Sequence, residues 1–195
     1  SPLPRPAPKP RPTPCPTTGS PRNQGTIAAT PIREPAPPAA AVRIRLDDLS
    51  GPEIRALLDE HVQSMHCLSP PGSVHVLDLA ALRTPDISVW TAWSGDQLLG
   101  CGALKALTAT HGEIKSMRTA TAHRGNGVAR AMLAHLIDEA VARDYEQLSL
   151  ETGSMAAFAP AHRLYESHGF AYCAPFGDYT DDPNSVYMTR RLRDG

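Results

Sequence analysis

The sequence predicts one α/β (α+β) domain with a mixed central β-sheet flanked by helices, in the order βαα-βββ-α-β-α-β, behind a proline-rich extension. Three observations predict this fold class. Apolar strand patterns alternate with helical ones over residues 41–195, and a glycine-rich turn joins a strand to the longest helix. These 155 residues are enough to bury one hydrophobic core.

Residues 1–40 differ from the rest in composition. They hold 13 of the 20 prolines and almost no bulky apolar side chain, and their net charge is +4 against −5 for residues 41–195. Such a segment cannot build a core, so we expect polyproline II and disordered states. We interpret it as an extension that the domain does not need, with a linker, a partner-binding arm and an overlong gene start as the possibilities.

The first half of the domain is predicted in chain order. A strand over 42–46 is followed by Ser50-Gly51-Pro52-Glu53, a capping box that opens a helix. The apolar face of this helix consists of Ile54, Leu57, Leu58, Val62 and Met65. His61 falls on the same face, where a satisfied interfacial histidine is expected rather than a catalytic one. A proline loop over 69–73 and a short helix over 77–82 follow.

The second half begins with strands over 87–94 and 97–107 around Ser94-Gly95-Asp96, a hairpin turn signal, and a third strand over 113–119. The long helix after the glycine turn should bury Leu133, Leu136, Ile137, Ala140 and Val141. A buried strand over 147–150 precedes a helix over 158–168, which should end at Gly169 as a C-terminal glycine cap. A strand over 186–191 closes the sheet.

The glycine turn predicts a pyrophosphate site. It reads Arg124-Gly125-Asn126-Gly127-Val128-Ala129 between a strand and a helix. Two glycines allow a tight turn with inward amide N–H groups, and the helix start adds unpaired donors and a positive dipole end. The P-loop pattern is absent, and a dinucleotide fingerprint would need a third glycine where Arg130 stands.

The pattern Arg-x-x-Gly-x-Ala resembles the acetyl-CoA-binding motif of the GCN5-related N-acetyltransferase (GNAT) superfamily. Residues 150–153 and 161–170 are similar to that family's fifth strand and to its Leu-Tyr-x-x-x-Gly-Phe signature. The resemblance covers about residues 100 to 172 and extends to a bacterial subgroup often labelled indole-acetic-acid acetyltransferase. It implies transfer of an acetyl group from acetyl-CoA to an amine by direct attack in a ternary complex.

The resemblance also implies which residues hold acetyl-CoA. The backbone of Met117, Arg118 and Thr119 would pair with the pantetheine arm as an added strand would. The loop residues Arg124, Gly125, Asn126, Gly127, Val128 and Ala129 would bind the pyrophosphate. Arg130 would contact a phosphate or remain a solvated cation.

Three residues are candidates for proton transfer. Tyr165 stands where many family members keep a tyrosine near the CoA sulfur, and a phenol suits protonation of a thiolate. Glu113 is preferred as the base because a regular strand places it on the same face as Met117. Glu151, at the end of the neighbouring strand, is the second candidate, and a histidine or a water route is the third possibility. Lys115 offers an alternative, in which it pairs with Glu113 and makes both structural.

The segment over 175–185 carries three aspartates and no cation, which favours a cationic acceptor such as a small amine, polyamine, amino sugar or lysine-like group; a plain solvated loop is the alternative. We expect a small-molecule amine. A protein N-terminus or lysine, and a non-catalytic CoA-binding regulator, are the alternatives. Neither nucleic-acid binding nor membrane insertion is expected, and a homodimer is left open. Four cysteines without paired spacing and the lack of a recognisable export signal favour reduced thiols in the cytoplasm. No metal site is expected.

Overall fold

The computed structural model describes residues 42–68 and 79–193. Seven strands form one sheet in the spatial order β1-β2-β3-β4-β5-β7-β6. Every neighbouring pair is antiparallel except β4 and β5, which run parallel, so the sheet is mixed as predicted. The strands are β1 (Arg43–Asp47), β2 (Ile87–Ser94), β3 (Gln97–Ala106), β4 (His111–Thr119), β5 (Gln147–Gly153), β6 (Ala171–Tyr172) and β7 (Ser185–Arg191).

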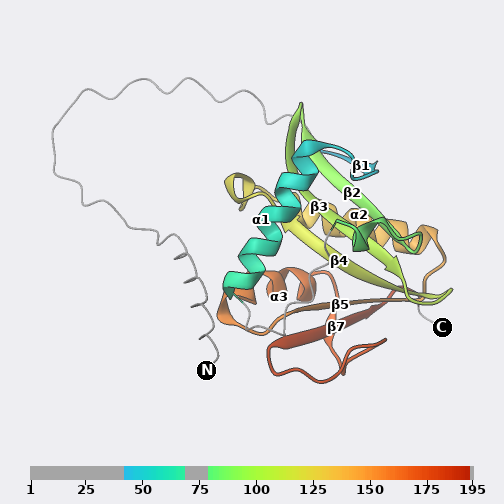
Figure 1. Cartoon of the computed structure of the whole chain (residues 1–195). Coiled ribbons are helices and arrows are strands. Elements are labelled where there is room, and N and C mark those ends of the chain that lie inside the picture. The colour runs from blue at the N-terminus through green and yellow to red at the C-terminus, as the bar shows by residue number, and fades with distance from the viewer. Residues whose placement is uncertain (1–41, 69–78, 194–195) are drawn as a thin grey trace, which may run out of the picture. The chain divides into compact units, whose positions relative to one another are not determined.

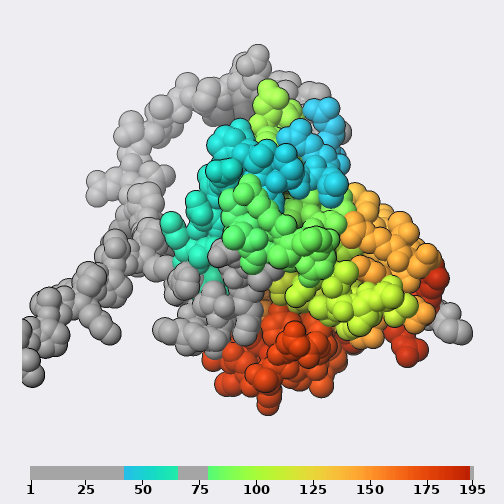
Figure 2. Space-filling view, turned by 45° about the vertical axis from the view of Figure 1, so that its right-hand side comes forward, coloured from blue at the N-terminus to red at the C-terminus, as the bar shows by residue number. Residues whose placement is uncertain are grey.

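Three α-helices lie within the described residues: α1 (Pro52–Leu68), α2 (Val128–Ala142) and α3 (Ala159–Glu166). Short 3-10 turns stand at Ala81–Arg83, Thr121–His123 and Ala156–Phe158. Figure 1 shows α1 in front of the sheet and α2 behind it. In Figure 2, β1 and α1 occupy the upper part of the domain's visible face and the segment after β5 the lower part. None of the helices in the described ranges is long and apolar enough to cross a membrane.

The two faces of the sheet bury two apolar clusters. The α1 cluster packs Ile54, Leu57 and Leu58 against Val89 and Ala103 of the sheet. The larger cluster, on the other face, combines the apolar side of α2 with Ile114 and Leu150, and α3 adds Tyr165 to it. The α1 face and the α2/α3 face are therefore distinct layers, which matters for the side chains of β4 and β5.

Most predicted elements are confirmed, with small shifts of their ends. The strand over 87–94 has the predicted bounds, and the helix predicted over 158–168 is a 3-10 turn followed by α3. Its glycine cap is confirmed. Gly169 has φ +81°, and the amides of Gly169 and Phe170 bond to the carbonyls of Glu166 and Tyr165 at 3.0 and 3.1 Å. These two bonds form a Schellman motif.

Three expectations are corrected. Val141 is 41% exposed, because the buried stripe of α2 is completed by Val128 and Met132 and turns away from Val141 at the helix end. The short helix expected over 77–82 is, in its described part, the 3-10 turn Ala81–Arg83. The two-residue strand β6 was not predicted, since it is too short to show an alternation. The extension over 1–40 and the proline loop over 69–73 lie outside the described residues.

Candidate active site

The sheet opens between β4 and β5. The parallel pairing runs from His111 opposite Gln147 to Ile114 opposite Leu150, and no further ladder joins the two strands in the described chain. Directly after this point Ser116 has φ +52°, and the register of β3 against β4 shifts between Cys101 and Ala103. A bulge of this kind bends a strand and re-aims its side chains. The bulge at Ser116 lies where β4 and β5 part.

A cavity of about 390 Å³ lies at this opening. Both strands line it, with Lys115–Thr119 from β4 and Glu151–Gly153 from β5. The helix α1 contributes His61 and Met65, and α3 contributes Tyr165. Arg124 and Ala129, at the glycine turn and the start of α2, complete the lining relevant to the predicted cofactor.

The bulge overturns one expectation about β4. A regular strand would place Glu113 and Met117 on the same face. Instead Met117, three residues after Ile114, lies on the same face as Ile114 and packs against the α2/α3 cluster. The extra residue at Ser116 shifts the alternation of side chains along β4 by one position. Glu113 and Met117 therefore do not share a face.

The glycine turn has the backbone that the sequence predicts. Gly125 and Gly127 have φ of +81° and +78°, a left-handed conformation that favours glycine. Gly127 is the N-cap of α2 and provides no side chain to bond the first amides of the helix. Those donors and the positive helix end therefore fit a polyphosphate. Arg130 is exposed on the first turn of α2.

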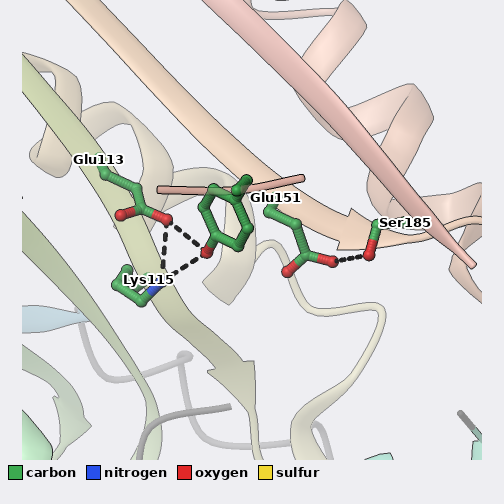
Figure 3. A network of polar contacts seen from close by, with 5 residues as sticks. Glu113, Lys115, Glu151 and Ser185 are labelled. Atoms are coloured by element: carbon green, nitrogen blue, oxygen red, sulfur yellow. Dashed lines mark hydrogen bonds and ion pairs between the residues drawn. The ribbon is translucent and has the colours of Figure 1, made fainter. Parts of the chain in front are cut away.

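The two candidate carboxylates have different surroundings. Glu113 is 2% exposed, and its Oε1 accepts hydrogen bonds from the ammonium of Lys115 and the hydroxyl of Tyr179, both at 2.8 Å. The Lys115 ammonium also bonds to the Tyr179 hydroxyl at 2.7 Å. Glu113 is not among the described residues that line the cavity, whereas Glu151 is. Figure 3 shows Glu113 turned toward Lys115, and Glu151 turned toward Ser185.

Glu151 stands where β5 has left β4. Leu148 and Leu150 point into the α2/α3 cluster, so the alternation of β5 places Ser149 and Glu151 on the α1 face. The hydroxyl of Ser185 donates a hydrogen bond of 2.7 Å to Glu151 Oε1. Glu151, the second candidate for the base, therefore lines the cavity, whereas Glu113, the preferred candidate, does not.

Tyr165 is buried in α3 and lines the cavity from the α2/α3 face. Its ring packs edge-on against Phe170, with centroids 5.9 Å apart. Burial, and then the nearby charge of Glu151, raise the pKa of the Tyr165 hydroxyl well above its ordinary value. The phenol is therefore protonated at neutral pH.

His61 is not the satisfied interfacial histidine that its position on α1 predicts. It is 9% exposed and lines the cavity, and its Nδ1 has no hydrogen-bond partner among the described residues. Burial, and then the charge of Arg118, lower the pKa of His61 to about 4. The spacing of α1 placed this side chain on the buried face, but no sequence signal shows whether a buried histidine has a partner.

The acidic loop lies outside the cavity. Asp178 and Asp181 are exposed, and no aspartate is found among the described lining residues. The loop is fixed by aromatic packing, with Tyr179 and Tyr187 ring centroids 5.5 Å apart and the Tyr187 hydroxyl bonded to the Thr180 carbonyl at 2.8 Å. These aspartates therefore give no support to a cationic acceptor.

Comparison with known proteins identifies the family. The model of the acetyltransferase (GNAT) family matches residues 54–170. The "Uncharacterized N-acetyltransferase YsnE" of Bacillus subtilis is 58% identical over 77% of this chain and all of its own length. The "IAA acetyltransferase" of Azospirillum brasilense is 38% identical, over 70% of this chain and 88% of that protein.

A solved structure supports the fold. The GNAT family acetyltransferase from Elizabethkingia anophelis, crystallised with acetyl-CoA bound, superposes with a TM-score of 0.57 at 18% identity, over 77% of this chain and 97% of that one. The glycine turn, the parted strands and the family match agree with one another. The chain belongs to the acetyltransferase (GNAT) family and is an N-acetyltransferase.

Proposed function

We propose that this N-acetyltransferase transfers the acetyl group of acetyl-CoA to the amine of a small molecule, by direct attack in a ternary complex. One observation carries the proposal. A single cavity is lined by a carboxylate, Glu151, by a protonated phenol, Tyr165, and by Arg124 and Ala129 of the glycine turn. Amine acetylation needs a base, an acid and a cofactor cradle, and these residues supply one of each.

The glycine turn would hold acetyl-CoA by its pyrophosphate, through the backbone amides of residues 125–129 and the positive end of α2. The parted edge of β4 would offer the backbone of Met117, Arg118 and Thr119 to the pantetheine arm. Acetyl-CoA supplies the acetyl group as an activated thioester. Side chains of the protein would transfer the protons and position the two substrates.

Glu151 is the base in this proposal. An alkylammonium has a pKa of about 10 and must lose a proton before its nitrogen attacks. Glu151 lines the cavity from the α1 face and would take that proton, directly or through a water. Tyr165 lines it from the other side and would give a proton to the departing thiolate. Glu113, bonded to Lys115 and Tyr179, would hold β4 to the loop before β7.

A thiol-release assay tests the proposal. Acetyl-CoA is incubated with the protein and a panel of small amines, polyamines, amino acids and peptides, and we expect turnover with at least one small amine. Turnover restricted to peptides or proteins would overturn the small-molecule assignment.

Tyr165→Phe tests the acid. The substitution keeps the packing on Phe170 and removes the transferable proton, so kcat should fall by about 10²-fold or more. Calorimetry should find the affinity for CoA unchanged. An unaltered kcat, on an acceptor that the wild type acetylates, would remove Tyr165 from the mechanism.

A further inference from the structure

Three polar atoms at the cavity are buried and unpaired. They are Nδ1 of His61, Oγ of Ser116 and Nε of Arg118, and none has a hydrogen-bond partner in the described part of the chain. All three residues line the cavity. A buried donor or acceptor left unpaired costs about 1–3 kcal/mol, so these three atoms call for partners, which a bound ligand can supply.

The three side chains come from two elements that face each other. His61 is on α1, and Ser116 and Arg118 are on β4 after the point where it parts from β5. Glu60, the neighbour of His61, accepts hydrogen bonds from the Nη2 of Arg118 at 2.9 Å and from the hydroxyl of Thr121 at 2.6 Å. The bond to Glu60 holds the Nη2 nitrogen of the guanidinium, whereas the Nε nitrogen is buried and has no partner among the described residues. The site is thus held in place from α1 and from the segment after β4.

The unpaired atoms share a chemical preference. The Arg118 Nε–H can only donate, the Ser116 hydroxyl can donate, and His61 Nδ1 donates in the tautomer that carries the proton there. Their common partner is therefore an oxygen acceptor. Because the guanidinium is charged and its side chain is only 11% exposed, a carboxylate is preferred over a neutral carbonyl.

We propose that the acceptor substrate carries a carboxylate as well as its reacting amine, and that Arg118, with His61 and Ser116, binds this carboxylate. The substrate class is then that of small amino acids. The inference rests on the proposed function, because Glu151 would deprotonate the amine of the same molecule whose carboxylate Arg118 binds.

The charges around the cavity support this class over a polyamine. Glu151 is the sole carboxylate among the described lining residues, while Lys115, Arg118 and Arg124 are cations there. An amino acid places its ammonium at the carboxylate and its carboxylate at a cation. A polyamine would instead bring a second ammonium beside Arg118, and like charges at such a distance repel.

The first experiment needs only the wild-type protein. Thiol release is measured with amino acids and with their carboxamides, which keep the amine and the side chain but lose the negative charge. We expect kcat/KM for the acid to exceed that for its carboxamide by about tenfold or more. Equal or better turnover of the carboxamides would overturn the inference and leave the proposed function intact. No turnover of any small amine would overturn both.

The second experiment assigns the residues. Arg118→Gln and His61→Phe should each raise KM for the amino acid by about tenfold while KM for its carboxamide and for acetyl-CoA stays the same. Arg193→Gln is the matched control, because Arg193 is half-exposed and pairs with Asp144 away from the cavity. If either site variant raised KM for acid and carboxamide alike, its residue would be supporting the fold and not binding a carboxylate.

Discussion

Glu113 and Glu151 are both carboxylates at the ends of neighbouring strands, yet they should respond differently to the same substitution. Glu151→Gln removes the proposed base, so kcat/KM should fall near neutral pH and recover as rising pH deprotonates the amine in solution. Glu113→Gln removes the anionic partner of the Lys115 ammonium, and it is the carboxylate side of this ion pair that is buried. Removing one partner of a buried ion pair costs about 3–5 kcal/mol. The main effect of Glu113→Gln should therefore be a lower free energy of unfolding, and not the loss of a base.

The measurements are pH profiles of kcat/KM and urea unfolding of both variants. A Glu113→Gln protein that unfolds like the wild type but has lost its activity at neutral pH, beside an active Glu151→Gln protein, would return the role of base to Glu113.

His61 should make the free energy of unfolding depend on pH. Its pKa is lowered to about 4 in the folded protein, against about 6.5 in the unfolded chain, by burial first and then by Arg118, with Glu60 acting weakly in the opposite direction. Between these pH values the unfolded chain binds a proton that the folded chain does not. The free energy of unfolding should therefore decrease as the pH falls from about 6.5 to 4, by about 3 kcal/mol in all.

Urea titrations at several pH values measure this loss, and His61→Asn should flatten the profile over that window. An identical pH dependence in His61→Asn would show that the loss comes from other groups.

At the level of secondary-structure elements, a substitution in the glycine turn should be limited by backbone conformation and not by the space for a side chain. A Cβ at Gly127 would meet nothing within 4 Å, but its φ of +78° is strained for any branched residue. Gly127→Val should therefore rearrange the turn and lower the affinity for CoA by about tenfold or more, at a conformational cost of about 1–2 kcal/mol.

Gly95→Val is the control, because Gly95 also has a positive φ, of +57°, and open space around it, in the hairpin between β2 and β3. It should cost similar stability and leave CoA affinity unchanged. Calorimetry showing normal CoA affinity in Gly127→Val would separate the turn from the cofactor.

The elements differ in how far the sequence determines them. Strands β2, β3 and β4 were predictable because apolar runs and a Ser-Gly-Asp turn set their period and their ends. The bulge at Ser116 was not, since serine has no preference for a positive φ and only the pairing of β3 with β4 creates it. That one residue decides which face Glu113 and Met117 occupy. The sequence therefore predicted the positive-φ backbone of the glycine turn and the burial of Tyr165, but not which of the two carboxylates lines the cavity.

At the scale of the whole molecule, the residues proposed for the cofactor and those proposed for the acceptor lie on different faces of the sheet. The α2/α3 face carries Tyr165 and the start of α2, which are the parts assigned to the cofactor. The α1 face carries His61, Arg118 and Glu151, which are the parts assigned to the acceptor. The opening between β4 and β5 is where these faces meet, so a reaction between two substrates would take place where these two strands part.

The last prediction concerns residues 1–40. Both described apolar clusters are built from residues at or after Ile44, and the extension has almost no bulky apolar side chain to add to them. Deletion of residues 1–40 should therefore leave kcat/KM and the melting temperature unchanged in a thermal scan. A destabilisation of about 1 kcal/mol lowers Tm by about 2–4 °C in a protein of this size, so a loss of more than about 5 °C would show that the extension packs on the domain. Because the extension carries a charge of +4 against −5 for the remainder, repeating the scan at high salt distinguishes the two causes of such a loss. An electrostatic contact would be screened in both proteins and the difference would vanish, whereas apolar packing would persist.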